Sequence, residues 1–309
     1  MTRAECAFTP AQGVHSTARP LDAVAIAIVL VLCLSWGFNQ VSVKLSLPDI
    51  PPYLQGVIRS VGAAVIVMAW MRARGLPLFE RDGSLKAGLL AGFLFGLEFL
   101  FLYPALLFTT ATRAVVFIYL TPFFVVIGAR WFLPADRFNR LQWAGLGLSF
   151  AGMLLAFGAP TPAADPRQML GDLMMVAAAA CWAATTLVIK ASVLNRIGFE
   201  KAMLYQLAVS APMLGLGALL MGERIIAMPS TVALGALIYQ TIWVVPVTFV
   251  AWFALIQRYS ANRLSAFTFL TPIFGVLAGH LVLGEPLTPA FVAAGAMVVA
   301  GLMLVNRSH

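Results

Sequence analysis

The sequence predicts an all-α integral membrane protein of ten transmembrane helices, arranged as two inverted five-helix repeats. Three observations support this fold class: the composition, ten apolar segments of membrane-spanning length, and an internal repeat. Hydrophobic residues make up 61% of the 309 residues and charged residues 10%, with a mean hydropathy of +0.92. A soluble domain carries about 25% charged residues, so the solvent around most of this chain is expected to be lipid.

Ten apolar runs, separated by proline, glycine and charged residues, approach the roughly 20 residues that a helix needs to cross the hydrocarbon core. Every connection between them is short, so the functional site is expected inside the bundle. The predicted spans are residues 23–43, 54–71, 85–108, 114–133, 141–157, 173–189, 203–221, 232–256, 264–283 and 291–305.

The basic residues indicate how the spans are oriented. With both termini in the cytoplasm, 15 of the 20 Lys and Arg residues fall on the cytoplasmic side, as the positive-inside rule requires. The other five are Lys44, Arg59, Arg113, Arg167 and Arg224. The net charge of +8 arises from residues scattered between apolar runs, so it does not indicate binding to nucleic acid.

The sequence also contains an internal repeat. Residues 36–46 (WGFNQVSVKLS) and 182–192 (WAATTLVIKAS) share Trp, Lys and Ser at an offset of 146. Residues 113–124 (RAVVFIYLTPFF) and 263–274 (RLSAFTFLTPIF) match at an offset of 150. Each repeat holds five spans, and an odd number inverts the second copy in the membrane. Many transporters use this arrangement to build two access states around a midplane site.

These matches divide the chain into two repeats with short flanking tails. The predicted units are a cytoplasmic N-terminal tail (1–20), a first five-helix repeat (21–160), a second five-helix repeat (161–306) and a cytoplasmic tail (307–309).

Glu98 is the only acidic residue predicted deep within a span, about 16 Å from the cytoplasmic end and close to the midplane. Gly88, Gly92 and Gly96 form a small-residue ridge on the other side of the same helix, suited to close helix contact. A charge at this depth is often functional. Glu98 is therefore a candidate to accept a substrate ammonium, or to titrate and couple transport to protons. The alternative is a structural role as a paired or neutral carboxyl group.

Two matching helix faces are expected near the repeat axis. Trp36, Asn39 and Gln40 share a face of the first span, and Trp182 and Thr186 repeat this pattern in the sixth. The same side chains also suit interhelical hydrogen bonds, so a packing role stays open for each. Further aromatic candidates for the substrate cavity are Tyr103, Tyr239 and Trp243. The alternative for these three is an interfacial aromatic belt.

Prolines inside predicted spans free a backbone carbonyl and bend the helix. Helix kinks are expected at Pro104, Pro122, Pro246 and Pro272. They would serve either as hinges beside the cavity or as static packing kinks. Lys44 and Lys190 end matching spans and favour a role as interfacial anchors. Arg59 lies about two turns below the outer surface, deep enough to require a partner.

Several short motifs together resemble a known family. They are LTPxF at 120–124 and 270–274, Ala-Leu pairs at 105–106 and 254–255, and LGEPLT at 283–288. In these motifs the chain is similar to the drug/metabolite transporter superfamily and, within it, to the EamA family of ten-span bacterial exporters. The resemblance implies a central cavity in a bacterial inner-membrane protein and substrates such as amino acids, including those of the aromatic amino acid exporter type. One departure is Pro134-Ala135-Asp136, where the second half has Gly284-Glu285.

We therefore expect a secondary transporter that exports small organic metabolites by alternating access through a central cavity. The cavity would be lined mainly by the first, third, fourth, sixth, eighth and ninth spans. An aromatic, sparsely polar lining favours aromatic or other hydrophobic amino acids, and other metabolites or drugs are the alternative. The expected partners are the small-molecule substrate and the lipid bilayer, with no nucleic acid and no obligate protein partner. No cofactor or metal is expected, since the three cysteines show no metal-ligand spacing.

An intramembrane enzyme is the alternative from another class. Ser149 and His280 faintly suggest a serine protease dyad, but Ser149 lacks the glycine that should follow it, and no GxGD or HExxH motif is present. No enzymatic activity is therefore expected. A channel is also disfavoured, because no filter-like sequence or ring of charged positions occurs.

Overall fold

The computed structural model describes residues 21–78, 80–109, 111–133, 137–158, 165–283 and 289–307. In the first half these residues form α1 (Ala23–Ser46), α2 (Pro52–Ala73), α3 (Leu85–Phe108), α4 (Ala111–Ile118), α5 (Thr121–Phe132) and α6 (Arg140–Phe157). In the second half they form α7 (Pro166–Ala191), the 3-10 helix η1 (Val193–Asn195), α8 (Phe199–Leu220), α9 (Thr231–Ile238), the π-helix η2 (Tyr239–Phe249), α10 (Val250–Arg258), α11 (Ala261–Phe267), α12 (Leu270–Leu283) and α13 (Pro289–Asn306).

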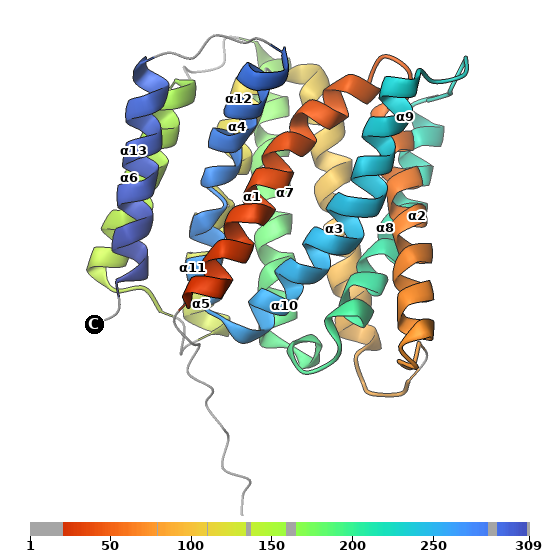
Figure 1. The fold of residues 1–309 in the computed structure, drawn as a ribbon, viewed down its shortest axis with the longest axis horizontal. Helices are drawn as coiled ribbons and strands as arrows, with labels where there is room; N and C mark the ends of the chain where they lie inside the picture. The colour runs from red at the N-terminus through yellow and green to blue at the C-terminus, as the bar shows by residue number, and fades with distance from the viewer. Residues whose placement is uncertain are drawn as a thin grey trace, which may run out of the picture.

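The helices form one upright bundle (Figure 1). The first and last described residues, 21 and 307, lie at the same end, which we call the terminal end; the opposite end is the far end. The predicted tail of residues 1–20, residues 308 and 309, the boundary between the repeats at residue 160, and the loop motifs at 134–136 and 284–288 lie outside the described residues.

The ten predicted spans correspond to these helices. Within the described residues, nine helical stretches are long and apolar enough to cross a membrane. The tenth span is α6, whose first turn carries Arg140 and Gln142 and is therefore less apolar; α6 packs along α13. Three spans are composite: α4 continues into α5, α9 through η2 into α10, and α11 into α12.

Helix packing follows the two-fold relation of inverted repeats. The first span of each repeat packs on the fourth span of the other, so that α1 contacts α12 and α7 contacts α5. Likewise α3, the third span of the first repeat, packs on α7 and α8. Its counterpart η2, in the third span of the second repeat, packs on α1 and α2. The matching helices α2 and α8 contact each other directly, and so do α6 and α13. The predicted fold of two inverted five-helix repeats is confirmed.

The fourth and ninth spans are broken at matching points. Tyr119 lies in the break between α4 and α5, and Phe269, at an offset of 150, lies in the break between α11 and α12. Their ring centroids are 6.4 Å apart, and both side chains are buried. Residues that contact their own counterparts lie on the pseudo-two-fold axis, so the two breaks meet at this axis.

The prolines of the two LTPxF motifs start new helices. Pro122 and Pro272 lie in the first turns of α5 and α12, whereas the sequence suggested kinks within continuous helices. Proline is favoured in a first turn because no hydrogen-bond partner is needed there for its missing N–H. The Thr121 hydroxyl donates to the carbonyl of Ile118 at 2.7 Å, which satisfies one acceptor left at the end of α4. Pro104 lies within α3, and Pro246 within η2.

Small residues allow the closest helix crossings. A Cβ on Gly37 of α1 would lie 2.6 Å from the backbone nitrogen of Gly275 in α12. A Cβ on Gly88, Gly92 or Gly96 of α3 would overlap atoms of α8. The predicted glycine ridge of α3 is thus confirmed as a packing surface, and its partner is α8.

We predict that Gly37→Ala lowers the free energy of unfolding by about 1–3 kcal/mol, since the added methyl group forces α1 away from α12. The measurement is the thermal unfolding midpoint in detergent micelles. Gly147→Ala is the matched control, because no atom lies within 4 Å of the Cβ it would add. Equal midpoints for the two variants would contradict the close crossing.

Candidate functional site

Glu98 lies in the interior of the bundle. It is the 14th of the 24 residues of α3, about 15 Å below the far end of that helix. Its side chain is 7% exposed. Within the described part of the chain, no hydrogen bond or ion pair to its carboxyl group is formed. A carboxyl group at this depth without a protein partner is available to a ligand or a proton.

Arg59 is a second buried charge near the same depth. It is the eighth residue of α2, about 10 Å below the far end, and it is 4% exposed. Its guanidinium carbon lies 4.7 Å from the ring centroid of Phe99, the residue after Glu98. Its Nε is buried without an acceptor among the described residues. Arg59 thus contacts the residue that follows Glu98, and no ion pair joins Arg59 to Glu98 in the described structure.

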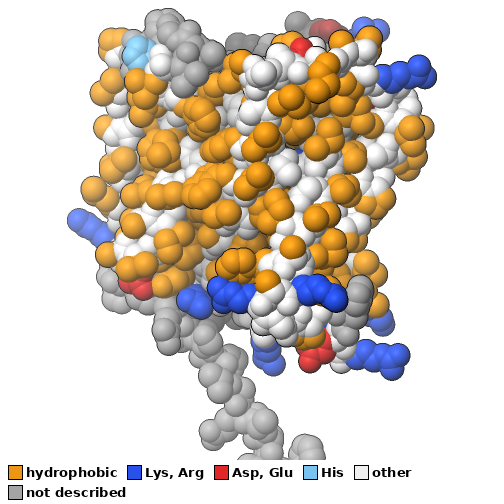
Figure 2. Space-filling model, turned by 45° about the vertical axis from the view of Figure 1, so that its right-hand side comes forward, with side chains coloured by type: hydrophobic (Ala, Val, Ile, Leu, Met, Phe, Trp, Pro, Cys, Tyr) orange, Lys and Arg blue, Asp and Glu red, His pale blue; other side chains and the backbone are white. Residues whose placement is uncertain are grey.

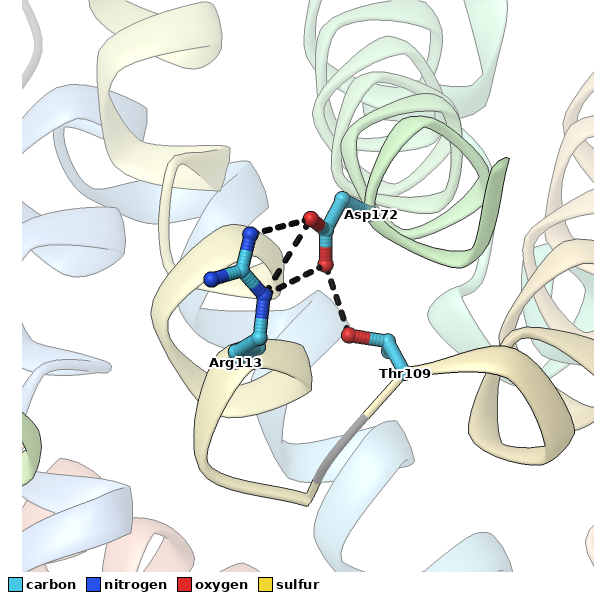
Figure 3. A network of polar contacts seen from close by, with 3 residues as sticks. All are labelled: Thr109, Arg113 and Asp172. Atoms are coloured by element: carbon cyan, nitrogen blue, oxygen red, sulfur yellow. Dashed lines mark hydrogen bonds and ion pairs between the residues drawn. The ribbon is translucent and has the colours of Figure 1, made fainter. Parts of the chain in front are cut away.

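Other buried charges form closed pairs near the two ends of the bundle. At the far end, Arg113 of α4 binds both carboxylate oxygens of Asp172 in α7, and the Thr109 hydroxyl donates to the same carboxylate at 2.6 Å (Figure 3). At the terminal end, Lys201 Nζ lies 2.6 Å from Asp82. Hydrogen bonds from Lys201 and Ser84 hold the pKa of Asp82 well below its usual range. The first pair ties α4 to α7, and the second ties α8 to the loop between α2 and α3, whereas no such direct contact joins Arg59 to Glu98 in the described structure.

A series of aromatic contacts passes beside Arg59 and Glu98, and we call it the aromatic chain. Consecutive ring centroids lie between 5.2 and 6.0 Å apart. The chain starts near the far end of α2, follows α3 and crosses to the second repeat at η2. Its members, in order of contact, are Tyr53, Tyr103, Phe99, Phe95, Phe249, Trp36 and Trp252. It connects the two repeats through a series of buried and half-buried aromatic rings.

The predicted aromatic residues of the first and eighth spans connect α1 to η2. Trp36 Nε1 donates to the Thr248 hydroxyl at 2.8 Å. The Tyr239 hydroxyl donates to the carbonyl of Ser35 at 3.1 Å, and Trp243 Nε1 donates to the Ser35 hydroxyl at 3.0 Å. Trp243 is 41% exposed, so much of its ring lies on the surface of the bundle. Pro246 cannot donate a helical hydrogen bond, and this segment is wound as a π-helix, a form often found at functional sites.

The remaining polar candidates lie on α1 and α7. Trp182 contacts Tyr119 near the axis, with ring centroids 6.5 Å apart. The buried Thr186 hydroxyl donates to the carbonyl of Trp182 in its own helix at 3.1 Å. Asn39 Oδ1 is buried without a donor among the described residues. The side chain of Gln40 lies outside what the structure describes.

Two features were missed in the sequence. The sixth span is predicted to begin at residue 173, whereas α7 begins at Pro166, where the Asp165 side chain accepts from the Arg167 N–H, so Asp172 lies inside the helix. The Asp165-Pro166 pair is the available signal, since Asp and Pro mark helix starts. The contact of Arg59 with Phe99 joins two helices, so no local pattern could reveal it.

Two further places bring polar groups together outside this region. The Ser149 hydroxyl donates to the carbonyl of Val298 at 3.3 Å between α6 and α13, a packing contact. A groove of about 480 Å³ lies between α2 and α8, where Glu223 accepts from the N–H groups of Tyr53 and Leu54. Its lining includes none of the predicted cavity residues.

Inverted five-helix repeats are an arrangement that many membrane transporters use. The comparison with family models agrees: residues 23–158 and 169–307 each match the EamA-like transporter family. The chain belongs to this family.

Curated relatives match over almost their full length. An uncharacterized transporter of Archaeoglobus fulgidus is 27% identical over 288 residues, covering 91% of this chain and 97% of the relative. The "probable amino-acid metabolite efflux pump" of Salmonella typhimurium is 24% identical, covering 90% of this chain and 93% of the relative. The uncharacterized inner membrane transporter YedA of Escherichia coli is 21% identical, covering 93% of this chain and 90% of the relative. One solved crystal structure has the same fold, with a TM-score of 0.78 at 21% identity, covering 92% of this chain and 96% of the other.

The first ring of the aromatic chain, Tyr53, makes a hydrogen bond that depends on a proline. Pro104 has no N–H to donate to the carbonyl of Leu100, and the Tyr53 hydroxyl donates to this carbonyl at 3.3 Å instead. We predict that Tyr53→Phe costs about 0.5–1.5 kcal/mol of unfolding free energy, measured by thermal unfolding. The cost should fall in a Pro104→Ala background, where the alanine N–H supplies the helical donor. An identical cost in both backgrounds would contradict this explanation.

Proposed function

We propose that this transporter exports aromatic or other hydrophobic amino acids across a bacterial inner membrane. The aromatic chain beside the buried Glu98 and Arg59 is the observation that carries the proposal. Aromatic faces suit large apolar side chains, and a buried carboxylate suits an ammonium group. The name of the Salmonella relative, an amino-acid metabolite efflux pump, supports the same substrate class.

Glu98 would act in one of two ways. It would accept the ammonium group of the substrate, or it would take up a proton and couple transport to the proton gradient. Both roles use a carboxyl group that lies near the middle of the bundle and has no partner among the described residues.

We also propose that the terminal end faces the cytoplasm. Lys and Arg side chains line the terminal end on the face drawn in Figure 2, below a broad hydrophobic belt. At this end lie basic residues in the last turns of α2 and α10 and in the loops that follow α2, α5 and α7, among them Arg72, Arg74, Arg137, Arg196 and Arg258. This distribution agrees with the positive-inside rule.

Transport would proceed by alternating access, and two related polar networks at opposite ends support this. We call Thr109, Arg113 and Asp172 the far-end latch. Arg113 is the third residue of α4, and Thr109 precedes it by four positions. The latch ties the start of the fourth span to α7 of the other repeat.

A counterpart of this latch lies at the terminal end. Arg263 is the third residue of α11, Tyr259 precedes it by four positions, and the Tyr259 hydroxyl donates to Asp22 at the start of α1 at 2.7 Å. Hydrogen bonds from the Ala25 N–H and from Tyr259 lower the pKa of Asp22, so it stays ionised. Among the described residues no ion pair joins Arg263 to Asp22. In the proposed cycle, the far-end latch opens when an ion pair forms between Arg263 and Asp22 at the terminal end.

We predict that Asp172→Asn opens the far end, because it removes the charge that holds Arg113. The measurement uses Cys181 as the only cysteine (Cys6 and Cys33 replaced by Ser), labelled in intact cells by a membrane-impermeant thiol reagent. Labelling should become at least about tenfold faster, because a partly buried ion pair contributes more than the 1.4 kcal/mol that this change requires. Asp165→Asn, at the exposed start of the same helix, is the control. Unchanged labelling in a folded Asp172→Asn protein would contradict the latch.

We predict saturable uptake of radiolabelled tryptophan, phenylalanine, methionine and leucine into proteoliposomes, reduced at least about tenfold by Glu98→Gln through loss of a charge-assisted contact. A pH gradient that accelerates wild-type flux but not the variant would assign the proton role. Flux indifferent to the gradient would leave the ammonium role. Flux of an unrelated metabolite with none of these amino acids would overturn the substrate assignment.

A further inference from the structure

We infer that Arg59 binds the carboxylate of the substrate while Glu98 binds its ammonium group, so that the site selects the zwitterionic head of an α-amino acid. The inference rests on the proposed export of amino acids and names the chemical feature that is recognised. It assigns a specificity role to Arg59, whose function the sequence did not reveal.

The guanidinium of Arg59 is held in place but not neutralised. Its guanidinium carbon lies over the ring of Phe99, 4.7 Å from the centroid. Its Nε has no acceptor in the described part of the chain, and the residue is 4% exposed. A planar guanidinium donates through its edge and is suited to bidentate contact with a carboxylate. A buried cation in this state is expensive unless an anion reaches it.

Glu98 supplies the opposite charge next to this contact. It directly precedes Phe99 in α3, the ring over which Arg59 lies, and no ion pair joins Glu98 to Arg59 in the described structure. In the ion pairs Arg113–Asp172 and Lys201–Asp82, by contrast, the charged groups are in direct contact. Two opposite charges kept apart at mid-depth match the two charges of a zwitterion, which would satisfy both at once.

The aromatic chain then places the substrate side chain. From Phe99 the chain continues through Phe95 and Phe249 to Trp36, away from the Tyr53 end. A head group bound between Arg59 and Glu98 leaves an apolar side chain in contact with these rings. The site therefore distinguishes an amino acid from an amine or an acid with the same apolar part, because each of those leaves one buried charge unpaired.

The test compares three compounds with one apolar group: L-phenylalanine, phenethylamine and 3-phenylpropanoate. Each competes against bound radiolabelled phenylalanine or tryptophan on purified protein in lipid nanodiscs. The wild type should bind phenylalanine at least about tenfold more tightly than either analogue. Arg59→Gln should weaken phenylalanine binding by at least about tenfold and leave phenethylamine binding unchanged. Arg59→Lys, which keeps the charge but loses the planar edge, should fall between the two.

Arg74→Gln is the matched control, since Arg74 also stacks on an aromatic ring, Trp70, but lies at the exposed end of α2. If Arg59→Gln folds poorly, the double variant with Glu98→Gln removes both buried charges together and should bind phenylalanine no better than the analogues. Equal losses for phenylalanine and phenethylamine, or preserved discrimination, would overturn the role of Arg59. A wild type that binds and moves no hydrophobic amino acid would instead refute the proposed function.

Discussion

Hydrocarbon offers a buried charge neither water nor counter-ions, and this constraint decides which polar groups the bundle can contain. Arg113 and Asp172 satisfy it by direct contact near the far end, as Lys201 and Asp82 do near the terminal end. Backbone groups obey the same rule, since the carbonyl freed by Pro104 accepts from the Tyr53 hydroxyl. Arg59 and Glu98 form no direct ion pair within the described residues, and this difference supports the proposed binding site.

Because the repeats are inverted, the same constraint acts on related residues at both ends of the bundle. The broken fourth and ninth spans meet at the axis through Tyr119 and Phe269. From there the first halves of these spans run to opposite ends, where each presents an arginine at its third residue. Polar contacts at the two ends therefore have related geometry, although Asp22 sits at a helix start and Asp172 lies within a helix. The polar contacts at one end are therefore connected, through the helix breaks at the axis, to the polar contacts at the other end.

Properties repeated along the chain could be predicted from the sequence. Apolar length located the ten spans, the LTPxF motifs revealed the repeat, and glycine spacing identified the α3 ridge. Properties that depend on contacts between distant segments could not be predicted. The stacking of Arg59 on Phe99 and the bond from Trp36 to Thr248 join residues from different helices. Proline is compatible with a kink and with a helix start, so the sequence alone could not show that helices end before Pro122 and Pro272.

The two repeats differ where their crossings should be equivalent, and this difference bears on the proposed cycle. In α1 and α12 the crossing uses Gly37 and Gly275, which brings the backbones together. The matching positions in α7 and α5 are Ala183 and Val125, whose buried side chains share one cluster. Identical crossings would give two access states of equal energy, because inversion would exchange them. In the proposed cycle, unequal crossings would remove this degeneracy, and one state would be favoured until substrate binding contributes differential energy. In the same proposed cycle, the Arg113–Asp172 ion pair of the far-end latch would make the favoured state the one that is closed at the far end.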